Sequence, residues 1–142
     1  MGKRVNEKFL VLYEELESLC RERYGVQSGG VTEYINRLNN VRYAPDRDEV
    51  LPRLVNYRNM KYRLASDAVA VRRSDAVSKA DVAWIRRFIK YMRKNKDPIS
   101  VYVKRARRYL RMRRFRKIFT IVSTVFVILA VVAIIILFAL NK

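Results

Sequence analysis

The chain has no histidine, one cysteine, three prolines and four glycines among its 142 residues. Without histidine it lacks the side chain most used for acid–base chemistry near neutral pH and the commonest metal ligand. A single cysteine excludes an intramolecular disulfide and a cysteine-based zinc cluster. We therefore predict a protein that is not an enzyme, with no catalytic residues, no metal site and no cofactor.

Acidic residues are also scarce, at 13 against 31 lysines and arginines, which gives a net charge of +18. Two groups of acidic residues fall on predicted helices. We interpret the first as a solvated helix face and the second as helix-start residues that favour the macrodipole, rather than as an active site or metal ligands. The groups are Glu14, Glu15 and Glu17, and Asp46, Asp48 and Glu49.

The one long apolar run covers residues 118–140, where the only polar side chains are Thr120, Ser123 and Thr124. As a helix of ~1.5 Å per residue, this run is roughly 34 Å long, which suffices for a ~30 Å hydrocarbon core. It lies at the wrong end of the chain for a signal peptide. The run predicts a C-terminal single transmembrane helix.

The segment before this run, residues 104–117, is strongly basic. By the positive-inside rule it places the N-terminal 117 residues in the cytosol and residues 141–142 on the far side, as a short outer tail. The sequence thus predicts a single-pass, tail-anchored protein of the cell membrane, with a polybasic juxtamembrane helix that contacts anionic lipid headgroups. The predicted membrane-surface residues are Lys104, Arg105, Arg107, Arg108, Arg111, Arg113, Arg114, Arg116 and Lys117.

Residues 1–103 have the pattern of an all-α protein, a compact cytosolic helical bundle of four to five helices. Ser78 and Asp81 have the spacing of a capping box, and Asp97-Pro98 is typical of an N-cap followed by a first helical position. Residues 66–77, which repeat Ser-Asp-Ala-Val, are interpreted as a loop. Cys20 falls on an apolar helix face and is expected to be a packed thiol. The predicted helices are 6–24, 32–40 with Thr32 as its cap, 48–65 with Pro52 in its first turn, 79–95, and 98–140.

The predicted helix 79–95 carries an apolar face and an opposite basic face, and Arg72, Arg73 and Lys96 add to the charge near it. Such a face is a solvated surface by default, and a surface for phosphate-bearing partners as the alternative. Five tyrosines fall among basic residues and have two interpretations, the rim of a core or a stacking surface for single-stranded nucleic acid. They are Tyr57, Tyr62, Tyr91, Tyr102 and Tyr109. The candidate binding residues of the basic face are Arg86, Arg87, Lys90, Arg93 and Lys94.

Residues 54–66, with the sequence LVNYRNMKYRLAS, resemble the "RN…LAH" helix of HEPN-type domains. These are small helical bundles, many of them RNases or toxins of defence and toxin–antitoxin systems. The resemblance matches Arg58 and Asn59 to the family's Arg-Asn pair, whereas Ser66 stands at the family's histidine position. Because that histidine supplies the acid or base for RNA cleavage, the resemblance implies a catalytically silent relative retained for binding, assembly or regulation.

These observations favour a non-enzymatic interaction module that binds protein or anionic lipid at the membrane. A membrane-tethered RNA- or DNA-binding protein is the first alternative, and an inactive HEPN-like relative from a toxin–antitoxin or defence system is another. The expected partners are therefore the membrane, through anionic lipid headgroups, and a protein, with nucleic acid left open.

Overall fold

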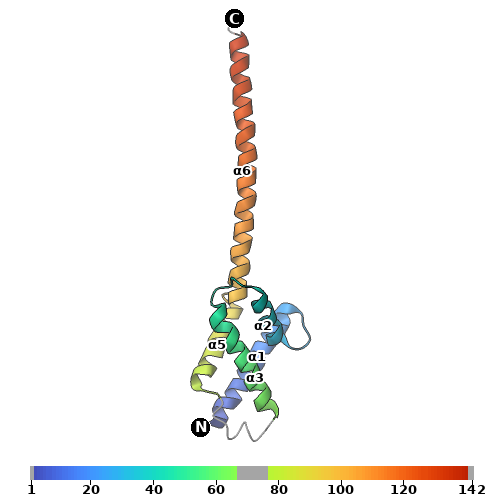
Figure 1. Cartoon of the computed structure of the whole chain (residues 1–142), viewed down its shortest axis with the longest axis vertical. Helices are drawn as coiled ribbons and strands as arrows, with labels where there is room; N and C mark the ends of the chain where they lie inside the picture. Colours follow the sequence, from blue (N-terminus) through green and yellow to red (C-terminus); the bar gives the residue numbers. More distant parts are fainter. Residues whose placement is uncertain (1, 67–76, 141–142) are drawn as a thin grey trace. The chain divides into compact units, whose positions relative to one another are not determined.

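The computed structural model describes residues 2–66 and 77–140. In these ranges every regular element is a helix, which confirms the all-α prediction (Figure 1). Arg72, Arg73, most of the Ser-Asp-Ala-Val repeat and the predicted outer tail at 141–142 lie outside the described residues. The helices are α1 (Gly2–Tyr24), α2 (Gly30–Asn40), α3 (Arg47–Ser66), α5 (Lys79–Arg93) and α6 (Pro98–Leu140).

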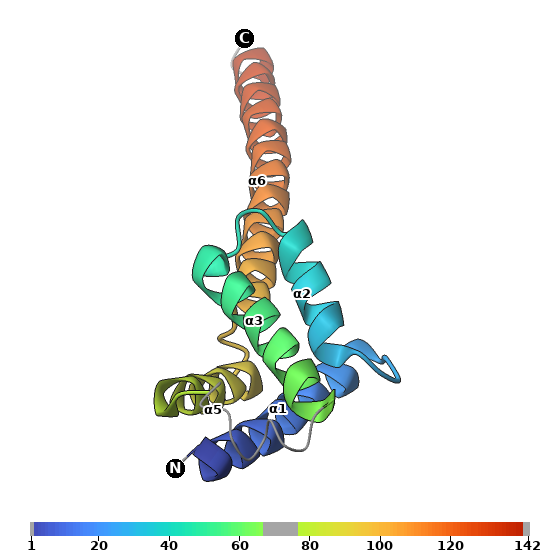
Figure 2. The same cartoon turned by 60° about the horizontal axis from the view of Figure 1, so that its bottom comes forward.

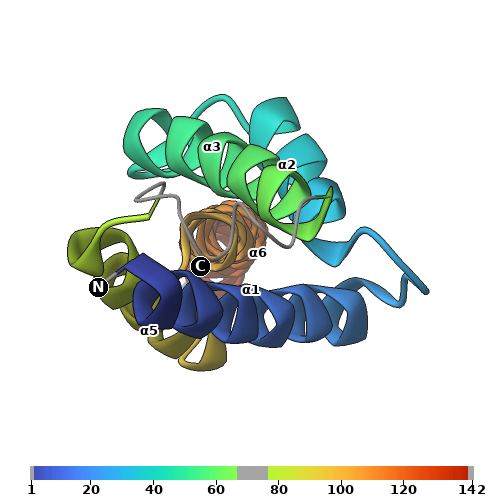
Figure 3. The same ribbon diagram turned by 90° about the horizontal axis from the view of Figure 1, so that it is seen from below.

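The chain divides into two compact units, Met1–Val103 and Lys104–Lys142. In the first unit α1 is the central helix and contacts α2, α3 and α5. Seen along the view of Figure 3, α2 and α3 lie together in one layer, and α1 lies with α5 in the other. Figure 2 shows α2 and α3 side by side along their lengths. The first unit is thus a small helical bundle, as predicted.

Aromatic side chains connect the helices at the core of the bundle. Tyr57 of α3 packs edge-on against Phe9 of α1, with ring centroids 5.7 Å apart, and against Trp84 of α5 at 5.4 Å. Trp84 stacks on Phe88 at 5.0 Å, and Phe88 packs edge-on against Tyr34 of α2 at 5.7 Å. Four helices are therefore joined by one continuous set of ring contacts, each adding to the stabilisation that apolar burial provides.

Three helix starts differ from the prediction. Helix α1 begins at Gly2 rather than at residue 6, and Asn6 is fully buried inside it, because nothing in the preceding residues interrupts a helix. Helix α2 begins at Gly30, so Thr32 lies inside the helix and is not its cap. Helix α3 begins at Arg47, which moves Pro52 from the first turn into the second.

The cap of α2 comes from another helix. The carboxylate of Glu17 on α1 accepts hydrogen bonds from the backbone amides of Gly30, at 2.5 Å, and Val31, at 2.9 Å. A Cβ on Gly30 would lie 2.6 Å from the backbone of both Arg21 and Glu17. The close crossing of α1 and α2 therefore requires glycine at this position. The crossing also brings the Glu17 carboxylate to two amides at the start of α2 that would otherwise lack a hydrogen-bond partner.

The last two helices begin as predicted. Ser78 accepts a hydrogen bond from the Asp81 amide at 3.1 Å, and the Asp81 carboxylate accepts one from the Ser78 amide at 2.9 Å, which completes the capping box. The predicted apolar face of α5 is buried throughout. Asp97 precedes Pro98 as the N-cap of α6, and its carboxylate accepts a hydrogen bond from the Ser100 amide at 3.3 Å.

The second unit contains the part of α6 from residue 104 onward. The basic segment 104–117 and the apolar segment 118–140 are helical, and their described side chains are exposed apart from partly exposed Ala106. The hydroxyls of Thr120 and Thr124 donate hydrogen bonds to the carbonyls of Arg116 and Thr120, each at 2.9 Å, so two of the polar groups in the apolar segment are satisfied within the helix. The described residues contain one helical segment long and apolar enough to cross a membrane.

Candidate functional site

The five basic residues predicted on α5 are exposed but do not form one surface. Arg86 and Arg93 face α1, and the guanidinium of Arg93 forms an ion pair of 2.6 Å with Glu15. Arg87 lines another hollow, between α3 and α5, which shares Ala83 with the hollow that Arg86 lines beside α1. Lys90 is exposed, and so is Lys94, which follows the last residue of α5. The five basic residues therefore lie in three different environments: facing α1, in the hollow between α3 and α5, or exposed to solvent. The predicted basic face is not a single binding surface.

Helices α1 and α5 run in the same direction along their shared seam. Lys79, Arg86 and Arg93 are spaced by seven residues, which places them on one stripe of α5. Arg93 at one end of this stripe meets Glu15, and the carbonyl of Met92 accepts a hydrogen bond of 2.6 Å from Arg23. Toward the other end, Arg86 and Lys79 lie beside the first turns of α1. The stripe thus brings basic residues of both helices together at the start of the seam.

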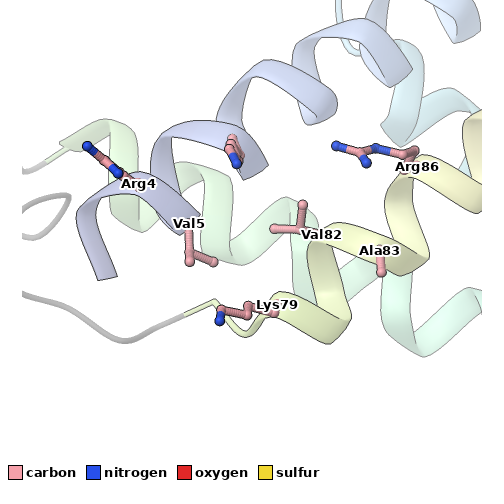
Figure 4. Close-up of a pocket in the computed structure, with 7 residues that line it drawn as sticks. Arg4, Val5, Lys79, Val82, Ala83 and Arg86 are labelled. Carbon is pink, nitrogen blue, oxygen red and sulfur yellow. The ribbon is translucent and has the colours of Figure 1, made fainter. Parts of the chain in front are cut away.

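A groove of about 730 Å³ opens at this end of the seam, between the N-terminal turns of α1 and α5 (Figure 4). Its apolar part consists of Val5, Val82 and Ala83. Its basic part comes from both helices, and Figure 4 shows the Arg4, Lys79 and Arg86 side chains set apart around the apolar residues rather than converging on one point. We call this surface the basic groove; its residues are Arg4, Val5, Lys8, Lys79, Val82, Ala83 and Arg86.

Within residues 2–66 and 77–140, the four cations of the basic groove have no ion-pair partner. No carboxylate lines the groove, and within residues 2–66 and 77–140 none of Arg4, Lys8, Lys79 and Arg86 forms an ion pair. All four side chains are exposed. Like charges gathered around an apolar floor raise the local positive potential, and an anionic group placed there would lower the energy of the site. The arrangement can therefore bind an anion.

The apolar floor extends along α1 into an adjoining hollow. This second hollow shares Arg4, Lys8 and Arg86 with the basic groove and adds Val11, Leu12 and Glu7. Val11 is 70% exposed, although it is a large aliphatic residue on the central helix of the bundle. The cations therefore flank an elongated apolar strip, and among the described residues that line the two hollows Glu7 is the one carboxylate.

The hollow between α3 and α5 has a different character. Arg53, Arg87 and Lys96 line it together with the carboxylates of Asp46 and Glu49. Arg53 also forms an ion pair with Glu49 at 3.4 Å and lies 5.5 Å from the centre of the Trp84 ring. Its mixed charge gives it no preference for an anion, so the basic groove is the better candidate.

The predicted tyrosine surface is also divided. Tyr57 is buried in the aromatic core, and Tyr102 is half-buried. Tyr62, Tyr91 and Tyr109 are exposed, but they lie on three different helices. None of these rings lines the basic groove. Tyr57 and Tyr102 thus fit the interpretation as core or core rim, whereas the three exposed tyrosines do not share one helix face.

The residues that carry the HEPN resemblance lie on α3. Arg58 is half-buried and Asn59 is exposed, while Ser66 ends the helix with its hydroxyl donating to the carbonyl of Arg63 at 3.0 Å. The described residues contain no group of three or more histidine, cysteine or carboxylate side chains placed to hold a metal ion. The resemblance and the absence of enzymatic activity remain predictions.

Two titratable side chains of the bundle, Cys20 and Tyr57, have pKa values that burial in the core shifts. Burial raises the pKa of the Cys20 thiol to about 12, with the Glu17 carboxylate adding to the rise, so this thiol is a packed core group as expected. Burial also raises the pKa of Tyr57 above its usual range, and its hydroxyl donates to Asp81 at 2.9 Å. Neither group lines the basic groove.

Sequence reasoning identified Arg86 but not Arg4, Lys8 or Lys79 as members of a common site. Arg4 and Lys8 are spaced by four residues, which places them on one face of α1 and is the local signal available. Their meeting with α5 depends on two helices that are some 75 residues apart in the chain. No pattern within either helix encodes that pairing.

One family match covers the first unit from residue 7 onward and the basic segment. A model of a family of unknown function, DUF6548, matches residues 7–119, which is most of the chain. The comparisons with curated proteins and with solved structures found no match.

Proposed function

This chain belongs to the family of unknown function DUF6548, and we propose that it is a single-pass, tail-anchored membrane protein whose helical domain is a non-enzymatic interaction module. In this proposal the apolar part of α6 spans the cell membrane, and the bundle faces the cytosol. The basic groove binds an anionic partner at the membrane surface.

The observation that carries the interaction role is the set of four exposed cations, without described ion pairs, around the apolar floor of the basic groove. Elsewhere among the described residues of the bundle, some exposed cations are matched, as Arg37 is with Glu33 at 2.6 Å and Arg93 with Glu15 at 2.6 Å, whereas others such as Lys90 are not; the groove differs in gathering four unpaired cations around one apolar floor. A folded domain gains no stability from an unmatched basic cluster, since like charges repel. Binding is a reason for such a cluster to exist.

Anchoring is supported by the apolar segment of α6 and by the basic segment before it. The basic residues of 104–117 point to all sides of the helix, because nine of fourteen consecutive positions are basic. A helix that lies flat on a membrane has one apolar and one charged face, whereas charge on all sides suits a helix that passes through a headgroup layer. The positive-inside rule then favours a cytosolic bundle.

Orientation can be tested with epitope tags at each end of the full chain and protease added to intact cells. We expect the N-terminal tag to survive until the membrane is permeabilised and the C-terminal tag to be removed at once. Loss of the N-terminal tag from intact cells would overturn the proposed orientation.

The interaction role can be tested by comparing two charge reversals on α5 in the full chain, solubilised in mild detergent at low salt. Lys79→Glu with Arg86→Glu changes the basic groove, whereas Lys90→Glu with Lys94→Glu makes the same charge change outside it. Size-exclusion chromatography measures whether each protein elutes in a complex with its partner. We expect the wild type and the Lys90/Lys94 variant to elute in a complex of the same size, and the Lys79/Arg86 variant to elute without its partner. An unchanged complex in the groove variant would contradict the proposal.

A further inference from the structure

We propose that the basic groove docks an acidic amphipathic helix or peptide of a partner protein, with its aliphatic side chains on the floor and its carboxylates against the surrounding cations. This inference rests on the proposed function and names the chemistry of the partner. It follows from the shape of the groove, the spacing of its charges and the side chains it lacks.

The site is elongated. The basic groove and the adjoining hollow share Arg4, Lys8 and Arg86, so the apolar strip continues along α1 from Val5 to Leu12. Eight helical residues correspond to roughly 10 Å of rise between the first and the last, about two turns of a docked helix. A headgroup phosphate is a single compact anion and would use only part of this length.

The cations of the groove are set apart from one another. In Figure 4 the Arg4, Lys79 and Arg86 side chains lie at separate positions around Val5, Val82 and Ala83. A site for one phosphate gathers donors at a single point, whereas separated cations match carboxylates spaced along a peptide. Charge complementarity of this kind fixes the register of a docked segment more than it adds to affinity.

The floor of the groove is aliphatic. Its residues in the groove are small or branched aliphatics, Val5, Val82 and Ala83, and exposed Val11 continues the strip. Single-stranded nucleic acid is bound on stacked aromatic side chains, and no aromatic residue lines either hollow. Val82 is already buried, but aliphatic side chains of a peptide would remove the exposed part of the strip, Ala83 and Val11, from water, so the observations favour a peptide over nucleic acid.

The test uses the full chain in nanodiscs of zwitterionic lipid and a labelled synthetic 14-residue peptide. The peptide has leucine or alanine at positions 1, 4, 5, 8, 11 and 12 and glutamate at most others. A second peptide has the same composition in scrambled order, which keeps the charge and removes the apolar stripe. We expect the ordered peptide to bind more tightly than the scrambled one, by about tenfold, because only the ordered peptide can place charges and aliphatic side chains together.

The variants on α5 supply the matched control. Lys79→Glu with Arg86→Glu should weaken binding of the ordered peptide by about tenfold or more, while Lys90→Glu with Lys94→Glu should change it less than about threefold. A peptide with lysine in place of glutamate should have a higher affinity for the groove variant than for the wild-type protein. This charge exchange distinguishes docking in the groove from general attraction to a basic protein.

Two outcomes would overturn the inference in distinguishable ways. If vesicles containing phosphatidylinositol phosphate or a 12-nucleotide single-stranded RNA bind through Lys79 and Arg86 while the ordered peptide does not, the groove binds anions, and the proposed function stands with a different partner. If neither peptide, vesicle nor RNA binding depends on Lys79 and Arg86, both the docking inference and the proposed use of the groove are wrong.

Discussion

The guanidinium of Arg23 lies 2.8 Å from the carboxylate of Asp97, which is fully buried at the start of α6. Arg23 also donates hydrogen bonds to the carbonyl of Met92 and the hydroxyl of Ser100, and Tyr34 donates to the same carboxylate at 3.1 Å. One ion pair thus ties the end of α1 to the end of α5 and the first turn of α6.

Replacing Asp97 with alanine is expected to lower the free energy of unfolding of the bundle by about 2–4 kcal/mol, because the change leaves a partly buried Arg23 without its partner and removes the α6 cap. The fluorescence of Trp84, the one tryptophan of the chain, reports unfolding in denaturant. Asp48→Asn is the control, since Asp48 is 95% exposed and its pair with Arg47 should contribute less than about 1 kcal/mol. Equal losses in the two variants would contradict this role of Arg23 and Asp97.

Replacing Gly30 with alanine should destabilise the bundle by about 1–3 kcal/mol, because the new Cβ meets backbone atoms that cannot move aside easily. Gly29→Ala tests the alternative that only backbone conformation matters. At Gly29 φ is +67°, and the nearest atom to a new Cβ is 3.9 Å away, so the cost there is that of the left-handed conformation, about 1 kcal/mol. Unfolding in denaturant should rank the Gly30 variant below the Gly29 variant, and the reverse order would contradict the close contact between α1 and α2.

The Asp81 carboxylate makes the stability of the bundle depend on pH. Burial disfavours its charged form, but hydrogen bonds from Ser78 and from the Tyr57 hydroxyl outweigh that effect, and the pKa of Asp81 lies below its usual range. A lowered pKa in the folded state means that stability is present above the unfolded value, about 3.9, and is lost as the pH falls through the folded value.

We therefore expect Asp81→Asn to be less stable than the wild type at pH 7 and to lose less stability between pH 5 and pH 3. Thermal unfolding followed by Trp84 fluorescence across this range measures both quantities. Parallel pH curves for the two proteins would show that the capping carboxylate is not stabilised in its charged form.

The Cys20 thiol should resist alkylation in the folded protein. Burial raises its pKa to about 12, and the side chain is 1% exposed, so both the thiolate and access to it are suppressed. We expect iodoacetamide at pH 8 to react with the folded chain about a hundredfold or more slowly than with the chain in denaturant. Because the chain has one cysteine, the mass shift reports this site alone. Similar rates in both conditions would mean that α1 does not pack as described.

Features that depend on neighbouring residues were predictable from the sequence. The capping box of Ser78 and Asp81, the buried face of α5, the start of α6 at Pro98 and the long apolar segment all follow from spacing within one element. Cys20 was correctly placed in the core from the periodicity of its helix. Local sequence therefore accounts for most of the helices and for the buried sides of several of them.

Features that depend on distant residues were not predictable. Glu17 caps α2 across 13 residues, so the expected cap at Thr32 was wrong. The basic groove was missed for the same reason, because Lys8 and Arg86 meet only through the packing of α1 on α5. The basic face of α5 was predicted from the sequence of that helix alone. Which of its cations form ion pairs depends on the neighbouring helices, as the pair between Arg93 and Glu15 of α1 shows.

The central claim, that the basic groove is an interaction surface in the cell, is tested most directly by photocrosslinking in native membranes. A photoreactive amino acid replaces exposed Ala83 in the groove or, as a control, exposed Ala65 near the end of α3. We expect a discrete crosslinked product from position 83 that disappears when Lys79 and Arg86 are changed to glutamate, and no such product from position 65. The same products from both positions, or a product from position 83 that survives the charge reversal, would contradict it.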